Sequence, residues 1–242
     1  NFRKKKSEKF DEAQSVYAEI SREFNYALTT DFIAWACFNL GLGAKAKCSE
    51  DLEEQLIGYA ICAEFIGFNG LIWLSKKILN RVESKIEQCT NKVLLAELKH
   101  TLGSAKYYQG LLDDSKRILL NSLPELEKRR SHIEGYTTHY LRHINSIRGH
   151  SARVLHWAHK ELESGLKTED NVVTAYALYG MADGLGRSGE FEKAIDSASE
   201  SGQRLRRSKS LACIIADQEL GRAFLQASRY DEAVAVTKAG RD

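Results

Sequence analysis

Proline is nearly missing from this chain: Pro124 is the only one in 242 residues. Helices exclude proline from their interiors, whereas sheet-rich chains of this length need more turn-forming residues. The alternation of apolar and polar residues that marks a half-buried strand is nowhere sustained. These absences predict an all-α protein.

An excess of charge of one sign is also lacking, because the formal net charge is only +2. So small a balance argues against a nucleic-acid partner. Basic residues do cluster at 3–6 and at 204–209. Such runs are typical of a solvated face, and binding of nucleic acid or acidic lipid is the alternative. The sequence has no secretory leader pattern and no apolar run of about 18 residues, so no membrane association is expected.

The five cysteines are odd in number and form no CxxC pair. Most lie in apolar runs such as AWACF and YAICAEF, which favours buried free thiols in a reducing compartment. We therefore expect a soluble, cytoplasmic protein. The chain begins at Asn1 and ends at Asp242 soon after a new helix has begun, which suggests a piece of a longer protein.

Motifs of phosphate binding and of nucleophilic catalysis are missing. The sequence contains no GxxxxGK[ST], GxGxxG, GxSxG or HExxH pattern. GLGAKA at 41–46 lacks a preceding strand and is interpreted as a helix end with a glycine cap. We expect no cofactor and no enzyme activity in this segment, while a catalytic domain elsewhere in a full-length protein stays open.

Histidine is confined to one stretch, residues 100–159. His139 and His143 stand four apart, and His156 and His159 stand three apart, so each pair would share a helix face. Two such pairs could bind zinc in a bundle, but no acidic or cysteine ligand lies at motif spacing. The preferred interpretation is surface or groove histidines without a metal, and a zinc protein or enzyme is the alternative.

A repeat is visible in the last third of the chain. GEFEKA at 189–194 matches SRYDEA at 228–233, which places Ala194 and Ala233 39 residues apart. Two steps back from Ala194 lead to Ser115, and the step between them predicts a turn near Gly149. Before the turns, Leu102-Gly103, Met181-Ala182 and Leu220-Gly221 recur. In each of these pairs, a small residue would let the paired helix approach closely.

These residues resemble the tetratricopeptide repeat (TPR), whose pattern is W-x2-L-G-x2-Y, then A-x3-F, then P. The tryptophan and the proline of that pattern are missing. The resemblance covers residues 91–242 and implies a right-handed α-solenoid of antiparallel helix pairs. Long units near 39–40 residues look like those of signal-transduction ATPase sensor arms, of peptide-pheromone receptors and of polarity adaptors. The matching positions are Leu178, Met181, Ala182, Leu185, Phe191, Ala194, Leu220, Gly221, Phe224, Tyr230 and Ala233.

The resemblance divides the chain into irregular N-terminal helical repeats over 1–90 and TPR-like repeats over about 91–130, 131–169, 170–208 and 209–242. In the first part, EKFDEA at 8–13 looks like a second-helix start, and helices are expected at roughly 30–46, 50–66 and 70–88. From Ala13 to the next anchor, Ser75, is 62 residues, which is not a whole number of repeats. Either one helix is extra or residues are absent from this part.

In the TPR family the first helix of each pair lines the concave face, and its inward positions contact the partner. Carried over to this chain, those positions are rich in Tyr, His and Arg, which are common at interface hot spots. Interhelix packing is the competing interpretation for each tyrosine. The lysine- and asparagine-rich clamp of chaperone-binding TPRs is absent. The predicted partner-binding residues are Tyr107, Tyr108, His139, His143, Tyr176, Tyr179, Asp183, Arg187, Gln218 and Arg222.

The sequence thus predicts a protein-protein interaction scaffold, or the sensor segment of a larger signalling protein, that binds a polypeptide in a concave groove. A receptor for a short signalling peptide is the second hypothesis. An enzyme or zinc protein that uses the His100–His159 cluster is the third. Neither the identity of the partner nor the oligomeric state follows from the sequence.

Overall fold

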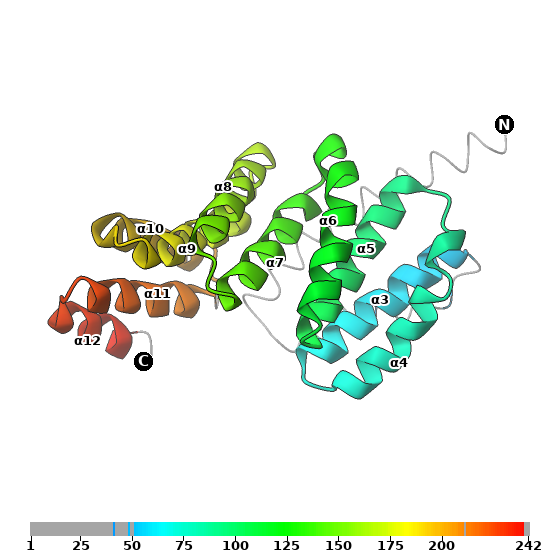
Figure 1. The fold of residues 1–242 in the computed structure, drawn as a ribbon, viewed down its shortest axis with the longest axis horizontal. Coiled ribbons are helices and arrows are strands. Elements are labelled where there is room, and N and C mark those ends of the chain that lie inside the picture. Colours follow the sequence, from blue (N-terminus) through cyan, green and yellow to red (C-terminus); the bar gives the residue numbers. More distant parts are fainter. Residues whose placement is uncertain (1–40, 42–47, 49–50, 211, 240–242) are drawn as a thin grey trace.

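In a computed structural model, residues 41, 48, 51–210 and 212–239 are described, and this part of the chain consists of helices joined by short turns (Figure 1). It contains no strand, so the all-α prediction is confirmed for it. The second-helix start expected at 8–13 and nearly all of the helix expected at 30–46 lie outside the described residues.

The described helices form five antiparallel pairs in a row, as the order of colours in Figure 1 shows. The pairs follow one another as an α-solenoid, because each helix packs mainly against its neighbours in the sequence. The pairs are α3 (Leu52–Phe68) with α4 (Ile72–Glu83), α5 (Lys92–Tyr108) with α6 (Leu112–Arg129), α7 (Ile133–Ile147) with α8 (Ser151–Lys167), α9 (Asn171–Arg187) with α10 (Phe191–Arg207), and α11 (Cys213–Gln226) with α12 (Tyr230–Ala239).

The turn inside each pair has one conformation throughout. Gly70, Gly110, Gly149 and Gly189 have φ between +73° and +84°, and Ser228 takes the same place with φ +61°. The residue after each of them donates its backbone N–H to the carbonyl five residues earlier, as Leu111 does to Lys106 at 3.0 Å. This is the Schellman ending of a helix, for which glycine is preferred. The predicted turn near Gly149 is confirmed.

The first helix of each pair begins at a polar cap. The side chains of Asp51, Asn91 and Asp170 each accept a backbone N–H from the first turn of α3, α5 and α9. Ser131 and Ser210 accept similarly from Ile133 and Ala212, near the starts of α7 and α11. Such caps satisfy N–H groups that have no partner within the helix, which fixes where each pair begins.

Close packing inside each pair depends on the predicted anchors. Ser115, Ala194 and Ala233 are all buried, and Ser75 occupies the same place in the first described pair. The repeat spacing thus extends to α3 and α4, although whether residues 1–90 form a separate, irregular part stays a prediction. A Cβ atom at Gly103 would lie 2.6 Å from Cδ2 of Leu119, so the small residue there is required.

Pro124 lies inside α6, exposed and near the carboxyl end, as an exception to the rule that helix interiors exclude proline. The expectation of buried thiols is wrong in detail. Among the described cysteines only Cys89 is buried. Cys62 and Cys213 are half-buried, and Cys48 is exposed. The apolar run around Cys62 therefore buries Ala60, Ile61 and Ala63 more fully than the thiol.

The odd-numbered helices form the inner row of the solenoid. α3 contacts α5, α5 contacts α7, α7 contacts α9, and α9 contacts α11, while successive even-numbered helices make at most marginal contact within the described residues. Rows that touch lie at the smaller radius of a curved stack. We call the side chains that the odd-numbered helices direct away from their even-numbered partners the inner face.

Candidate functional site

The inner face consists of repeat-equivalent positions on five helices. One set of equivalent positions runs through all of them, one residue per helix, and we call it the middle row. Its chemistry changes from one helix to the next, because the residues at these positions are not alike. The middle row is Glu64, Ser104, His143, Asp183 and Arg222.

Beside the middle row, aromatic rings from α3, α5 and α7 pack on one another. The Tyr108 ring contacts Phe68 edge to face at 5.3 Å between centroids, and Tyr107 lies 5.3 Å from Tyr140. All three tyrosines are half-buried. Aromatic pairs at such distances contribute about 0.5–1.5 kcal/mol beyond their burial. The rings therefore form a rigid surface that is still partly open to a partner.

A chain of hydroxyl groups ends at a carboxyl group on α3. The Tyr108 and Tyr140 hydroxyls lie 3.0 Å apart, and the Tyr140 hydroxyl donates to Oε1 of Glu64 at 3.3 Å. Burial raises the pKa of Glu64 to about 7, against hydrogen bonds from Ser104 and Tyr140 that act to lower it. Burial likewise raises the pKa of Glu97, on α5, to about 7.

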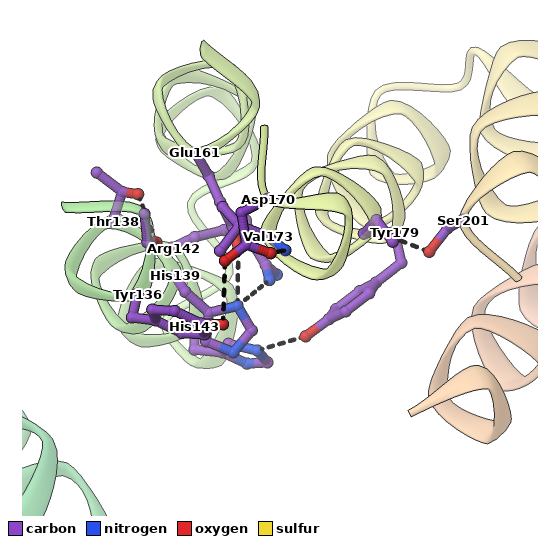
Figure 2. A network of polar contacts seen from close by, with 12 residues as sticks. Tyr136, Thr138, His139, Arg142, His143, Glu161, Asp170, Val173, Tyr179 and Ser201 are labelled. Carbon is purple, nitrogen blue, oxygen red and sulfur yellow. Dashed lines mark hydrogen bonds and ion pairs between the residues drawn. The ribbon is translucent and has the colours of Figure 1, made fainter. Parts of the chain in front are cut away.

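At the centre of the inner face an ion pair is fully enclosed, and Figure 2 shows its residues converging from α7 and α8. Arg142 donates from Nε to Oε2 of Glu161 at 2.7 Å, and the other oxygen, Oε1, lies 2.7 Å from Nδ1 of His139. Burial alone would raise the pKa of Glu161, but Arg142 and His139 bring the pKa below its usual value. The Arg142 guanidinium also lies 4.6 Å from the centre of the Tyr179 ring.

The two histidines of α7 face the tyrosines of α9. The Tyr179 hydroxyl lies 3.0 Å from Nε2 of His143, and the His139 ring lies 4.9 Å from that of Tyr176. Burial, reinforced by the charge of Arg142, holds the pKa of His143 well below its usual value. His143 is therefore neutral near pH 7, so its Nε2 can accept a hydrogen bond from the Tyr179 hydroxyl.

Toward α11 the inner face carries two arginines on one carboxylate. Oδ1 of Asp183 accepts from Nε of Arg187 and from Nη2 of Arg222, each at 2.6 Å. Its other oxygen accepts from Ser146 at 2.6 Å, and Arg222 also pairs with Glu219. Burial would raise the pKa of Asp183, yet these hydrogen bonds and charges lower it. Asp183 thus stays ionised and fixes both guanidinium groups.

His100 has a defined tautomer. Its Nδ1 lies 2.8 Å from the Thr137 hydroxyl, which itself donates to the Ile133 carbonyl at 2.9 Å. Because the only proton of that hydroxyl is already donated to the Ile133 carbonyl, the hydroxyl must act as the acceptor here, and His100 must donate from Nδ1. Burial, with the nearby charges of His132 and His139, lowers the pKa of His100 to about 3.

The structure brings most of the predicted partner-binding residues together on the inner face. Tyr107, Tyr108, His139, His143 and Tyr176 are half-buried there, and Arg187 and Arg222 have side chains 32% and 37% exposed. Tyr179 and Asp183 are only 4% and 5% exposed, so they support neighbours rather than meet a partner directly. Gln218 is exposed on α11, one turn before Arg222. That these residues bind a partner stays a prediction.

Sequence reasoning missed several members of these networks. Glu64, Tyr140, Arg142, Glu161 and Glu219 are not among the residues that the sequence predicts for the site. Arg142 occupies the place of the small residues Gly103 and Ala182, and this break in the repeat was the available signal.

The two histidine pairs of the alternative zinc interpretation lie apart in the structure. His100, His139 and His143 lie on odd-numbered helices, whereas His156 and His159 are exposed on α8. Among the described residues no group of three or more His, Cys, Asp and Glu side chains could hold a metal ion. In the same part of the chain, no helix is both long enough and apolar enough to cross a bilayer.

Comparison with solved structures defines the class of protein. BtubC (BKLC) from P. vanneervenii superposes with a TM-score of 0.66 at 11% identity, covering 86% of this chain and 88% of that one. A protein of Podosopora anserina, named as a kinesin light chain with nearly identical TPR-like repeats, gives a TM-score of 0.63 at 14% identity over 80% of this chain and 96% of its own. A Rap protein complexed with Competence and Sporulation Factor gives 0.73 at 13% identity over 92% of this chain.

The chain is therefore a TPR-like repeat protein by its fold, and the resemblance in the sequence is confirmed. It spans 62% of the length of the Rap protein. No protein-family model matches the sequence, and no curated protein matches it significantly.

Proposed function

We propose that this chain is a protein-interaction scaffold that holds a polypeptide segment against its inner face. The observation that carries the proposal is the continuity of that face. Half-buried aromatic and hydrogen-bonding side chains follow one another from Glu64 on α3 to Arg222 on α11, linked by short contacts. A tyrosine offers a large contact area and a hydroxyl while ordering few torsions, which suits a binding surface.

A non-catalytic role for this segment is part of the proposal. Its histidines are held by structural partners, His139 by Glu161 and His143 by Tyr179, and both have pKa values below the usual range. A nucleophile with an oriented base, as covalent catalysis requires, is not formed by these pairs.

Selection from a displayed library of random 16-residue peptides tests the scaffold function. We expect the wild-type chain to enrich peptides whose binding is weakened by Tyr176→Ala and by Arg222→Ala. Tyr179→Ala is a poor choice, because that side chain is buried and its loss would leave a cavity. Trp73→Ala is the matched control, since Trp73 is 70% exposed on the outer helix α4. Enriched peptides whose binding is affected neither by Tyr176→Ala nor by Arg222→Ala would contradict the proposal.

A receptor for a short signalling peptide is the second candidate. It is favoured by the similarity to the Rap protein, whose structure is a complex with Competence and Sporulation Factor. The two candidates differ in the length of partner that suffices. A rise in melting temperature with free peptides of five to eight residues, on the order of a few degrees at saturation, would favour the receptor. Dependence on longer segments or whole proteins would favour the scaffold.

A further inference from the structure

The middle row changes its charge from one end to the other. Glu64 stands at its α3 end, and Arg222 stands at its α11 end next to Asp183. The neutral Ser104 and His143 lie between Glu64 and Asp183. The inference below rests on the proposed binding function and adds the kind of polypeptide that this order would recognise.

At the α3 end the acidic groups have no cationic partner within the described residues. Glu64 is bonded by hydroxyl groups, and no ion pair joins it or Glu97 to a basic side chain of the described part. Both side chains are half-buried, and burial raises the pKa of each to about 7. A carboxylate that has lost water without gaining a cation is destabilised. A basic side chain from a partner would supply the missing cation.

At the α11 end the partly exposed charges are cationic, although each already has an acidic partner. The carboxylate of Asp183 is buried, while the side chains of Arg187 and Arg222 that it holds are about one third exposed. Only Nη2 of Arg222 bonds to Asp183 and Glu219, so its other N–H groups are left for a partner. Because the two guanidinium groups are already oriented, a partner carboxylate would order little on binding.

Between the ends, the inner face offers groups that suit an extended chain. Tyr107, Tyr108, Tyr140 and Tyr176 present partly exposed rings with hydroxyl groups. Peptide groups of an extended segment can hydrogen-bond such hydroxyls, whereas a helix has already paired its own peptide groups.

We infer that the inner face selects an extended polypeptide segment with a basic side chain at the α3 end and an acidic side chain at the α11 end. Glu64 and Arg222 are four helices apart in the inner row, and packed helices lie roughly 8–10 Å apart. An extended chain advances about 3.3 Å per residue. The two charged residues of the partner should therefore stand about 10–12 positions apart.

The peptide library described above, selected against matched variants, tests this charge order. Wild-type selection should enrich peptides in which Lys or Arg stands about 10–12 positions from Asp or Glu, given the spacing above. Glu64→Gln should remove the preference for the basic residue and keep that for the acidic one. The double change Arg187→Gln with Arg222→Gln should do the opposite. Asp196→Asn and Arg207→Gln, which alter exposed residues of the outer helix α10, are the controls.

Affinity measurements sharpen the test. For one enriched peptide, Glu64→Gln should weaken binding roughly tenfold in fluorescence anisotropy, and exchanging the basic residue of that peptide for glutamine should then cost the variant little further. Circular dichroism confirms that each variant is folded.

The outcomes separate the two claims. Enriched peptides without a charge order, or with an order indifferent to Glu64 and to the arginine pair, overturn the inference and leave the scaffold function standing. Failure to enrich any peptide, or enrichment insensitive to both Tyr176→Ala and Arg222→Ala, overturns both.

Discussion

The Nε atom of Arg142 lies 2.7 Å from Oε2 of Glu161, and these side chains are 1% and 0% exposed. Both residues stand where other pairs of the solenoid have small side chains. The place of Arg142 is taken by Gly103 in one neighbouring pair and by Ala182 in the other. In the helix pair α7–α8 a buried ion pair therefore replaces the close contact of small residues. The two ions also position inner-face side chains, since Glu161 bonds His139 and Arg142 lies over the Tyr179 ring.

Breaking this ion pair on one side should be far more damaging than removing it altogether. Glu161→Met or Arg142→Met alone should lower the free energy of unfolding by about 3–5 kcal/mol, because either change leaves a buried charged group without its partner. The double variant Arg142→Met with Glu161→Met should lose clearly less than the sum of the two. Urea denaturation of all four proteins measures this coupling. Additive losses would show that the two side chains act independently.

Gly180 on α9 makes room for the same arginine. A Cβ atom there would lie 2.3 Å from both Cδ and Nε of Arg142. Gly180→Ala should therefore lower stability by about 1–3 kcal/mol despite the better helix propensity of alanine. In an Arg142→Ala background the same change should be neutral or stabilising. A loss of equal size in both backgrounds, measured by thermal melting, would place the clash elsewhere.

His100 should make the chain less stable in acid. Its pKa is about 3 when folded and near 6.5 when unfolded, so between these values the unfolded state binds the extra proton. Stability is therefore lost as pH falls below 6.5. His100→Asn keeps a donor for Thr137 and does not titrate. Between pH 7 and pH 5 its free energy of unfolding should fall by about 2 kcal/mol less than that of wild type. Parallel denaturation curves at the two pH values decide the matter.

Glu64 should have the opposite pH dependence. Because its pKa is raised to about 7, the folded state keeps a proton that the unfolded state loses above about pH 4.5. Wild-type stability therefore falls as pH rises from 4.5 to 7. The free energy of unfolding of Glu64→Gln, relative to that of wild type, should rise over that interval by an amount on the order of 1–3 kcal/mol. A difference between the two proteins that stays constant with pH would contradict the raised pKa.

The sequence predicted the repeat where the helix pairs are alike. Ala194 and Ala233, with the turns at Gly189 and Ser228 before them, gave a spacing that also located the turn at Gly149. It found no small-residue landmark in α7, because Arg142 stands at the position that Gly103 and Ala182 occupy in the neighbouring pairs. It also left the register of α3 and α4 open, since the turn at Gly70 is hidden in an apolar run that ends at the exposed Trp73.

The inward positions were found through the family pattern, but their energetics were not. A position on a helix does not reveal whether a side chain is half-buried, like Tyr176, or enclosed, like Tyr179. Nor does it reveal partners from other helices. The pairing of Asp183 with Arg222 joins residues 39 positions apart and depends on how α9 and α11 stack.

The cover that α9 provides over Arg142 limits where the α7–α8 pair can stand in an array. Gly180 and Tyr179 both belong to the following pair, so a chain cut off after α8 would leave the guanidinium and its carboxylate at a water-facing edge. Pairs whose contacts use only small apolar residues place no charged group at such an edge. The α7–α8 pair needs a helix after it that covers the ion pair. A duplicated or shortened chain therefore keeps the ion pair buried only if α9 is retained with α7 and α8.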